Sequence, residues 1–167
     1  MSSLKTVEWK NNKVVMIDQT KLPNELVFVE YSDYSDVAKA IKTLIVRGAP
    51  AIGVSGAFGL ALAALQSKAT TKEQLLSDLE FARRILFETR PTAVNLAWGL
   101  DKIMQVAKQA NEVSQIKDLI IKTAQDMAED DIKINMRMGK NGSVLFDNND
   151  TIMTHCNAGS LATVAYG

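Results

Sequence analysis

The alternation of apolar and polar residues near the start of the chain predicts a small antiparallel β-sheet over residues 1–31. Two runs rich in β-forming residues lie between residues 6 and 18, and the polar turn Lys10-Asn11-Asn12-Lys13 separates them. This spacing is typical of a β-hairpin. A third apolar run, residues 26–31, is expected to add a third strand.

From residue 32 to about residue 140 the apolar positions recur at helical spacing, which predicts a helical bundle. Asp33 or Ser35 can cap the first helix. The sequence Thr71-Lys72-Glu73-Gln74 has the pattern of a capping box and predicts a helix that continues to about residue 88. A last long helix over about residues 114–138 is expected to end at Gly139.

Turn-forming residues beyond this helix mark a boundary near residues 140–150. The short apolar segment 151–153, the run Thr154-His155-Cys156-Asn157-Ala158-Gly159 and the small residues that follow predict a strand, a tight turn and a helix. A single strand–helix unit cannot bury its own strand. Residues 146–167 are therefore expected to begin a second, truncated α/β domain after an N-terminal domain of residues 1–145, and the fold class is α+β, mostly α.

Composition narrows the kind of protein further. Nineteen basic and nineteen acidic residues give a net charge of zero, which provides no electrostatic reason for binding nucleic acid or a membrane surface. The single cysteine cannot form an internal disulfide, and the N-terminus lacks the apolar core of a signal peptide, so a cytoplasmic protein is expected. The uncharged stretch 48–67 is long enough to span a membrane, but its Gly, Ala and Ser content favours a buried helix of a soluble protein.

Two sharp turns place an arginine directly before a predicted helix. They are Arg47-Gly48-Ala49-Pro50 and Thr89-Arg90-Pro91-Thr92, in which Thr92 is placed to cap the helix. The start of a helix offers unpaired N–H groups to an anion, arginine adds a fork that fits phosphate oxygens, and Gly48 would let the backbone approach a ligand. The alternative is that both arginines pair with nearby carboxylates at the surface.

Gly53, Gly56 and Gly59 follow the first of these turns. Their spacing differs from that of a dinucleotide-binding loop, and no strand precedes them. Close packing of a helix against its neighbour is the expected reason for them, because each glycine costs about 1 kcal/mol of helix propensity that tight contact must offset.

Cys156 is the residue most suggestive of chemistry. At a turn before a helix its thiolate form would be favoured, whereas the alternative is an inert, buried cysteine. His155 is not expected to act as its base, because neighbours along a strand point to opposite faces. No metal site is expected, since one histidine and one cysteine do not make a ligand set. Glu129, Asp130 and Asp131 are expected to form a solvated helix face.

Three motifs together resemble methylthioribose-1-phosphate isomerases and the related initiation-factor regulatory subunits. In chain order they are Arg47-Gly48-Ala49-Pro50-Ala51-Ile52-Gly53, Thr89-Arg90-Pro91-Thr92-Ala93-Val94-Asn95-Leu96 and Thr154-His155-Cys156-Asn157-Ala158-Gly159. Each motif is moderately specific, and all three in register are strongly specific. The resemblance extends from about residue 18 to the C-terminus.

The resemblance implies an aldose–ketose isomerase that converts 5-methylthioribose 1-phosphate to 5-methylthioribulose 1-phosphate in methionine salvage, without a cofactor. It implies that Arg47, Gly48, Ala49 and Asn157 bind the sugar phosphate, that Arg90 holds phosphate, and that Cys156 is a catalytic acid–base thiol. It further implies a Rossmann-like second domain that supplies a catalytic aspartate and most of a homodimer interface. On this basis the 167-residue chain is expected to be the front part of a longer polypeptide and to lack turnover by itself.

Three other functions remain open. Archaeal ribose-1,5-bisphosphate isomerases share the motifs, so the preferred pentose is undetermined. A regulatory subunit that senses a sugar phosphate or nucleotide could use the same loops without catalysis. A helical protein–protein module could use apolar residues 151–167 as a docking surface.

Overall fold

The computed structural model describes residues 4–167, and it begins with the expected three-stranded antiparallel sheet. Strands β1 (Val7–Lys10), β2 (Lys13–Ile17) and β3 (Phe28–Tyr31) lie in the order β1-β2-β3. Lys10 pairs with Lys13 across a two-residue turn in which Asn11 and Asn12 have φ values of 52° and 58°. Asparagine tolerates this left-handed region, which is why the turn can close the hairpin so tightly.

Five helices follow the sheet and confirm the mostly α, α+β class. They are α1 (Tyr34–Lys42), α2 (Ala49–Gln66), α3 (Lys72–Glu88), α4 (Val94–Ala107) and α5 (Val113–Ser143). Asp33 caps α1 by accepting the Ser35 N–H, and Thr71 caps α3 by accepting the Gln74 N–H. Both caps agree with the sequence pattern.

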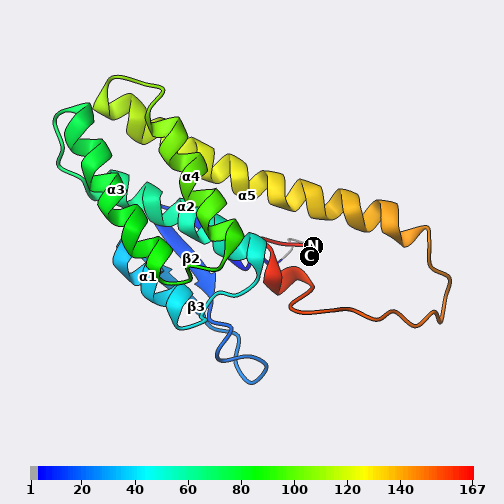
Figure 1. Ribbon diagram of the computed structural model, residues 1–167. Helices are drawn as coiled ribbons and strands as arrows, with labels where there is room; N and C mark the ends of the chain where they lie inside the picture. Colours follow the sequence, from blue (N-terminus) through cyan, green and yellow to red (C-terminus); the bar gives the residue numbers. More distant parts are fainter. Residues whose placement is uncertain (1–3) are drawn as a thin grey trace.

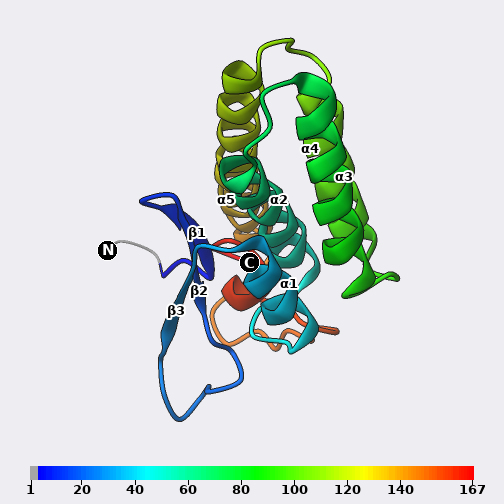
Figure 2. The same ribbon diagram turned by 90° about the vertical axis from the view of Figure 1, so that its left-hand side faces the viewer.

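Helix α2 is the centre of the domain. It packs against the other four helices and against β1 and β2, so that the sheet and the bundle share one core (Figures 1 and 2). It is long and apolar enough to be a candidate membrane span, but 78% of it is buried inside the domain. A Cβ at Gly53 would lie 2.8 Å from the backbone oxygen of Asn95, and one at Gly99 would lie 2.4 Å from that of Gly53. The glycines therefore allow close packing between α2 and α4, as expected.

The end of α5 differs from the prediction. The helix continues through Gly139 and Gly142 to Ser143, because neither glycine adopts the left-handed conformation that ends a helix. The C-terminal part of α5 extends beyond the bundle, and the chain then bends back toward the sheet (Figure 1).

The strand and α-helix predicted after residue 150 are wrong for this chain. Residues 151–158 have no regular secondary structure, and only a single 3-10 turn, η1 (Ser160–Ala162), follows. A strand needs a neighbouring edge for its backbone hydrogen bonds, and within residues 4–167 none lies beside this segment. Ala162, Val164 and Ala165 are nevertheless buried, since the chain returns to pack on the N-terminal domain.

Candidate functional site

One hollow of about 830 Å³ lies where the starts of α2 and α4 meet the returning chain. All six residues singled out from the sequence line it: Arg47, Gly48 and Ala49 from the turn before α2, Arg90 from the turn before α4, and Cys156 and Asn157 from the returning chain. The remaining lining residues are Leu44, Pro50, Ile52, Thr92, Ala93, Val94 and Asn95. Segments more than 100 residues apart in sequence thus converge on one cavity.

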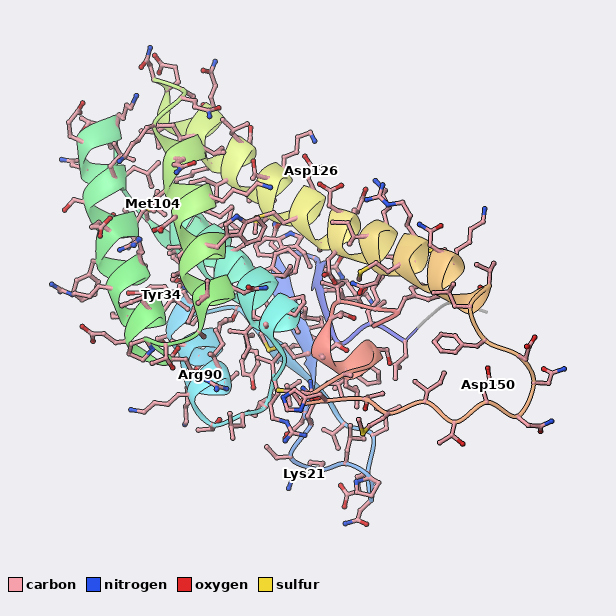
Figure 3. All side chains as sticks on the ribbon, turned by 45° about the vertical axis from the view of Figure 1, so that its right-hand side comes forward. Lys21, Tyr34, Arg90, Met104, Asp126 and Asp150 are labelled. Atoms are coloured by element: carbon pink, nitrogen blue, oxygen red, sulfur yellow. The ribbon has the colours of Figure 1, made fainter. Side chains whose placement is uncertain are left out.

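The two arginines give the hollow a positive character. Arg47 is exposed and Arg90 is half-buried, and Arg90 lies in the connection between α3 and α4 (Figure 3). Within residues 4–167 neither arginine forms an ion pair, which removes the alternative that local carboxylates occupy them. No acidic side chain of the described chain lines the hollow. Both guanidinium groups are therefore available to an anionic ligand.

The backbone adds to this character. The N-cap residues of α2 and α4 are Gly48 and Ala93, and neither provides a side-chain hydrogen bond to the first turn. The sequence suggested Thr92 as the cap of α4, so that assignment is wrong by one residue. In contrast, Asp33 and Thr71 close the starts of α1 and α3. The N–H groups of Ala49 in α2 and of Val94 and Asn95 in α4 are left for a ligand, at the positive ends of two helix dipoles.

Cys156 is exposed and has a φ of 61°, in the left-handed region that side chains other than glycine rarely adopt. Leu44 and Gly48, also on the hollow, have φ values of 64° and 93°. Such conformations tend to gather at functional sites. The expected helix start beside Cys156 is absent, because η1 begins four residues later and is only three residues long. The positive groups near the thiol are instead those that line the hollow from Arg47, Arg90 and the starts of α2 and α4.

Gly48 has a different role from the expected one. A Cβ on Gly48 would lie 2.3 Å from the Cα of Ala162. The space that a side chain at this position would need is therefore occupied by η1. Glycine is required here by its positive φ and by this contact rather than by the approach of a ligand. Its place on the hollow is unaffected.

Leu44, Val94 and Asn95 line the hollow but were not singled out as site residues. Leu44 follows α1 and has the spacing of a core residue, yet its backbone turns left-handed and leaves the side chain 43% exposed. Val94 and Asn95 belong to the second arginine motif, and their positions in the first turn of α4 could have identified them. In the part of the chain that the structure describes, no group of three or more His, Cys, Asp or Glu residues could hold a metal ion.

Comparison with known proteins gives consistent matches. The methylthioribose-1-phosphate isomerase of Geotalea uraniireducens is 45% identical over 99% of this chain, and that of Crocosphaera subtropica is 45% identical over all of it. These alignments cover 48% and 50% of the two relatives, so the chain spans about half the length of the curated relatives it matches.

Solved structures show the same fold. A crystal structure described as 5-methylthioribose 1-phosphate isomerase from Pyrococcus horikoshii matches with a TM-score of 0.92 and 47% identity, over 99% of this chain and 47% of that one. One described as the delta subunit of translation initiation factor eIF-2B from A. fulgidus matches with a TM-score of 0.90 and 41% identity, over 99% and 48%. The profile of the initiation factor 2 subunit family matches residues 45–166, which include every residue of the hollow except Leu44. The chain belongs to the initiation factor 2 subunit family.

Proposed function

We propose that this chain provides the phosphate-binding part of an aldose–ketose isomerase that converts 5-methylthioribose 1-phosphate to 5-methylthioribulose 1-phosphate. The observation that carries the proposal is the convergence of two unpaired arginines, two open helix starts and one exposed thiol on a single hollow. Relatives described as this isomerase support the choice of substrate.

The roles of the residues follow from their chemistry. Arg47 and Arg90 donate forked hydrogen bonds to phosphate oxygens, and the backbone N–H of Ala49 at the start of α2 adds a donor. Asn157 can donate to a sugar hydroxyl and accept from it. Cys156 donates a proton to the sugar, or accepts one from it, while the sugar ring opens at the anomeric carbon.

The overall reaction is an internal redox change in which C2 of the sugar is oxidised and C1 is reduced. The bond between C1 and the ring oxygen breaks and that oxygen takes up a proton, while the C2 hydroxyl loses its proton as the C2 carbonyl forms. The hydrogen on C2 is lost and one is gained at C1, and the phosphate stays in place, so the balance requires no external oxidant or reductant. No cofactor and no metal belong to the proposed reaction. A homodimer, a Rossmann-like α/β domain that begins near residue 146, and a cytoplasmic location belong to the same proposal.

The test uses the product of the complete reading frame with 5-methylthioribose 1-phosphate, and ketose formation is followed by NMR. Turnover is expected in the wild type. Cys156→Ser should abolish it, while calorimetry still detects binding of the sugar phosphate, because both arginines remain. A wild type that binds the sugar phosphate but forms no ketose would contradict the proposal.

A second candidate is a non-catalytic regulatory subunit that binds a sugar phosphate or nucleotide. The likeness to the structure described as an initiation-factor subunit favours it. It predicts binding without turnover and no effect of Cys156→Ser. Titration with ribose 1,5-bisphosphate beside the methylthio-sugar separates the two isomerase substrates within the first candidate.

A further inference from the structure

The loop that carries Cys156 and Asn157 is not held in place by its own contacts. Residues 151–158 are exposed, and the hydrogen bonds near them, such as Asp150 N–H to the Asp147 oxygen, are local to the bend before them. Asp150 marks the outer bend of this loop, far from the bundle (Figure 3). The position of the thiol on the hollow must therefore be fixed by the chain that follows it.

That following segment, residues 160–164, is anchored from two directions. On the sheet side the Thr6 N–H donates to the Val164 oxygen at 2.9 Å, and the Thr6 hydroxyl donates to the Ser160 oxygen at 2.8 Å. The Gln19 side-chain amide donates to the Leu161 oxygen at 2.9 Å. These bonds use only carbonyl groups of the segment.

Helix α5 provides the opposite anchor through one carboxylate. Asp131 Oδ2 accepts the Val164 N–H at 2.7 Å. Both backbone groups of Val164 are therefore bonded, its carbonyl to Thr6 just before β1 and its N–H to α5. Asn135 donates from Nδ2 to Asp131 Oδ1 at 3.2 Å and fixes the orientation of the carboxylate. The sequence-based expectation of a solvated Asp131 is therefore wrong, whereas its neighbour Asp130 is exposed.

Retention of a carboxylate here requires an explanation. Burial raises the pKa of Asp131 above its usual value of 3.8, although the Val164 and Asn135 bonds act in the opposite direction. Burial therefore disfavours the charged form of this carboxyl, and the two hydrogen bonds offset only part of that effect. A charge-assisted bond to a backbone N–H is short and strong, however, and it fixes position well.

We propose that Asp131 is a positioning residue, which docks residues 160–164 and thereby holds Cys156 and Asn157 on the hollow opposite Arg47 and Arg90. The docked segment also touches the backbone of Gly48 through Ala162. One carboxylate on α5 thus sets the geometry between the returning chain and the first arginine turn. This inference rests on the proposed function only in the first experiment below, which measures isomerase activity.

The first experiment measures kcat and KM for 5-methylthioribose 1-phosphate in the product of the complete reading frame. Asp131→Ala is expected to lower kcat about 10- to 100-fold, the loss that follows from one charge-assisted bond. KM should change by a smaller factor than kcat, because Arg90 lies in the connection between α3 and α4 and keeps its phosphate contact. Asp131→Asn keeps an oxygen that can accept the Val164 N–H and should retain most of the activity. Asp130→Ala is the matched control and should behave as the wild type.

The second experiment needs no turnover and therefore separates this proposal from the proposed function. Cys156 is the only cysteine of this 167-residue chain, and any cysteine elsewhere in the complete reading frame is replaced by serine, so that a nitroxide spin label reacts at Cys156 alone. The label should be immobilised in the wild type, Asp131→Asn and Asp130→Ala, and mobile in Asp131→Ala. Equal spectra for the wild type and Asp131→Ala would overturn the proposal, as would an Asp131→Asn enzyme as impaired as Asp131→Ala.

Folding is monitored by circular dichroism, and hydrogen exchange in the wild type covers the case in which Asp131→Ala does not fold. The Val164 amide should exchange much more slowly than the amides of residues 151–158, because only Val164 is bonded to α5. Equal exchange rates would overturn the proposal without any variant.

Discussion

The contact between Gly48 and Ala162 gives the sharpest test of the structure. Gly48 has a φ of 93°, and the Cβ of an alanine at this position would lie 2.3 Å from the Cα and 2.4 Å from the oxygen of Ala162. Both clashing atoms are backbone, so no side-chain rotation relieves the overlap. Gly48→Ala must therefore strain the turn, displace η1, or do both.

The cost can be estimated from these two effects. An unfavourable backbone conformation costs about 1–3 kcal/mol, and overpacking a tight contact costs roughly another 1–3 kcal/mol. A free energy of unfolding lower by about 2–6 kcal/mol is expected, and a melting temperature lower by roughly 4–24 °C for a domain of this size. The same displacement should loosen the loop that carries Cys156.

Gly139→Ala is the matched control. Gly139 lies in α5, and nothing lies within 4 Å of the Cβ that alanine would add. Alanine should therefore stabilise the helix by about 0.5–1 kcal/mol through its higher helix propensity. Urea unfolding followed by circular dichroism measures both variants. A Gly48→Ala protein within 0.5 kcal/mol of the wild type, a threshold of about the size typical of surface changes, would refute the packing of the returning chain on the first arginine turn.

Three further outcomes are expected. Arg90→Gln should weaken binding of the sugar phosphate about 10- to 100-fold in calorimetry, because a charge-assisted phosphate contact is lost. The control Arg84→Gln removes only a cation that lies over the ring of Phe81, and it should leave the binding affinity unchanged. The pKa of Asp131 is raised in the folded state, so just above pH 3.8 the folded protein binds more protons than the unfolded chain. The free energy of unfolding therefore falls as the pH rises through this range. In urea titrations the wild type should gain stability relative to Asp131→Asn as the pH falls from 7 to 4. Thr71→Ala should lower the free energy of unfolding by about 1 kcal/mol in the same assay, through loss of the cap on α3, and no change would contradict the capping geometry.

The sequence by itself determined the elements whose signals are local. The Asn11-Asn12 turn, the Asp33 and Thr71 caps and the glycines of α2 act through backbone preferences and spacing within a few residues, and the structure confirms each of them. The arginine turns were likewise recognisable, because the residues that interrupt one helix and start the next are neighbours in the sequence.

The tertiary structure alone decided what surrounds those elements. The packing of Ala162 on Gly48 and the bond from Val164 to Asp131 depend on contacts between segments that the local pattern does not relate. The predicted strand after residue 150 is not formed, since a strand needs a neighbouring strand to bond its backbone N–H and C=O groups, whatever its own residues are. The convergence of Arg47, Arg90 and Cys156 on one hollow likewise required the chain to return to the body of the domain.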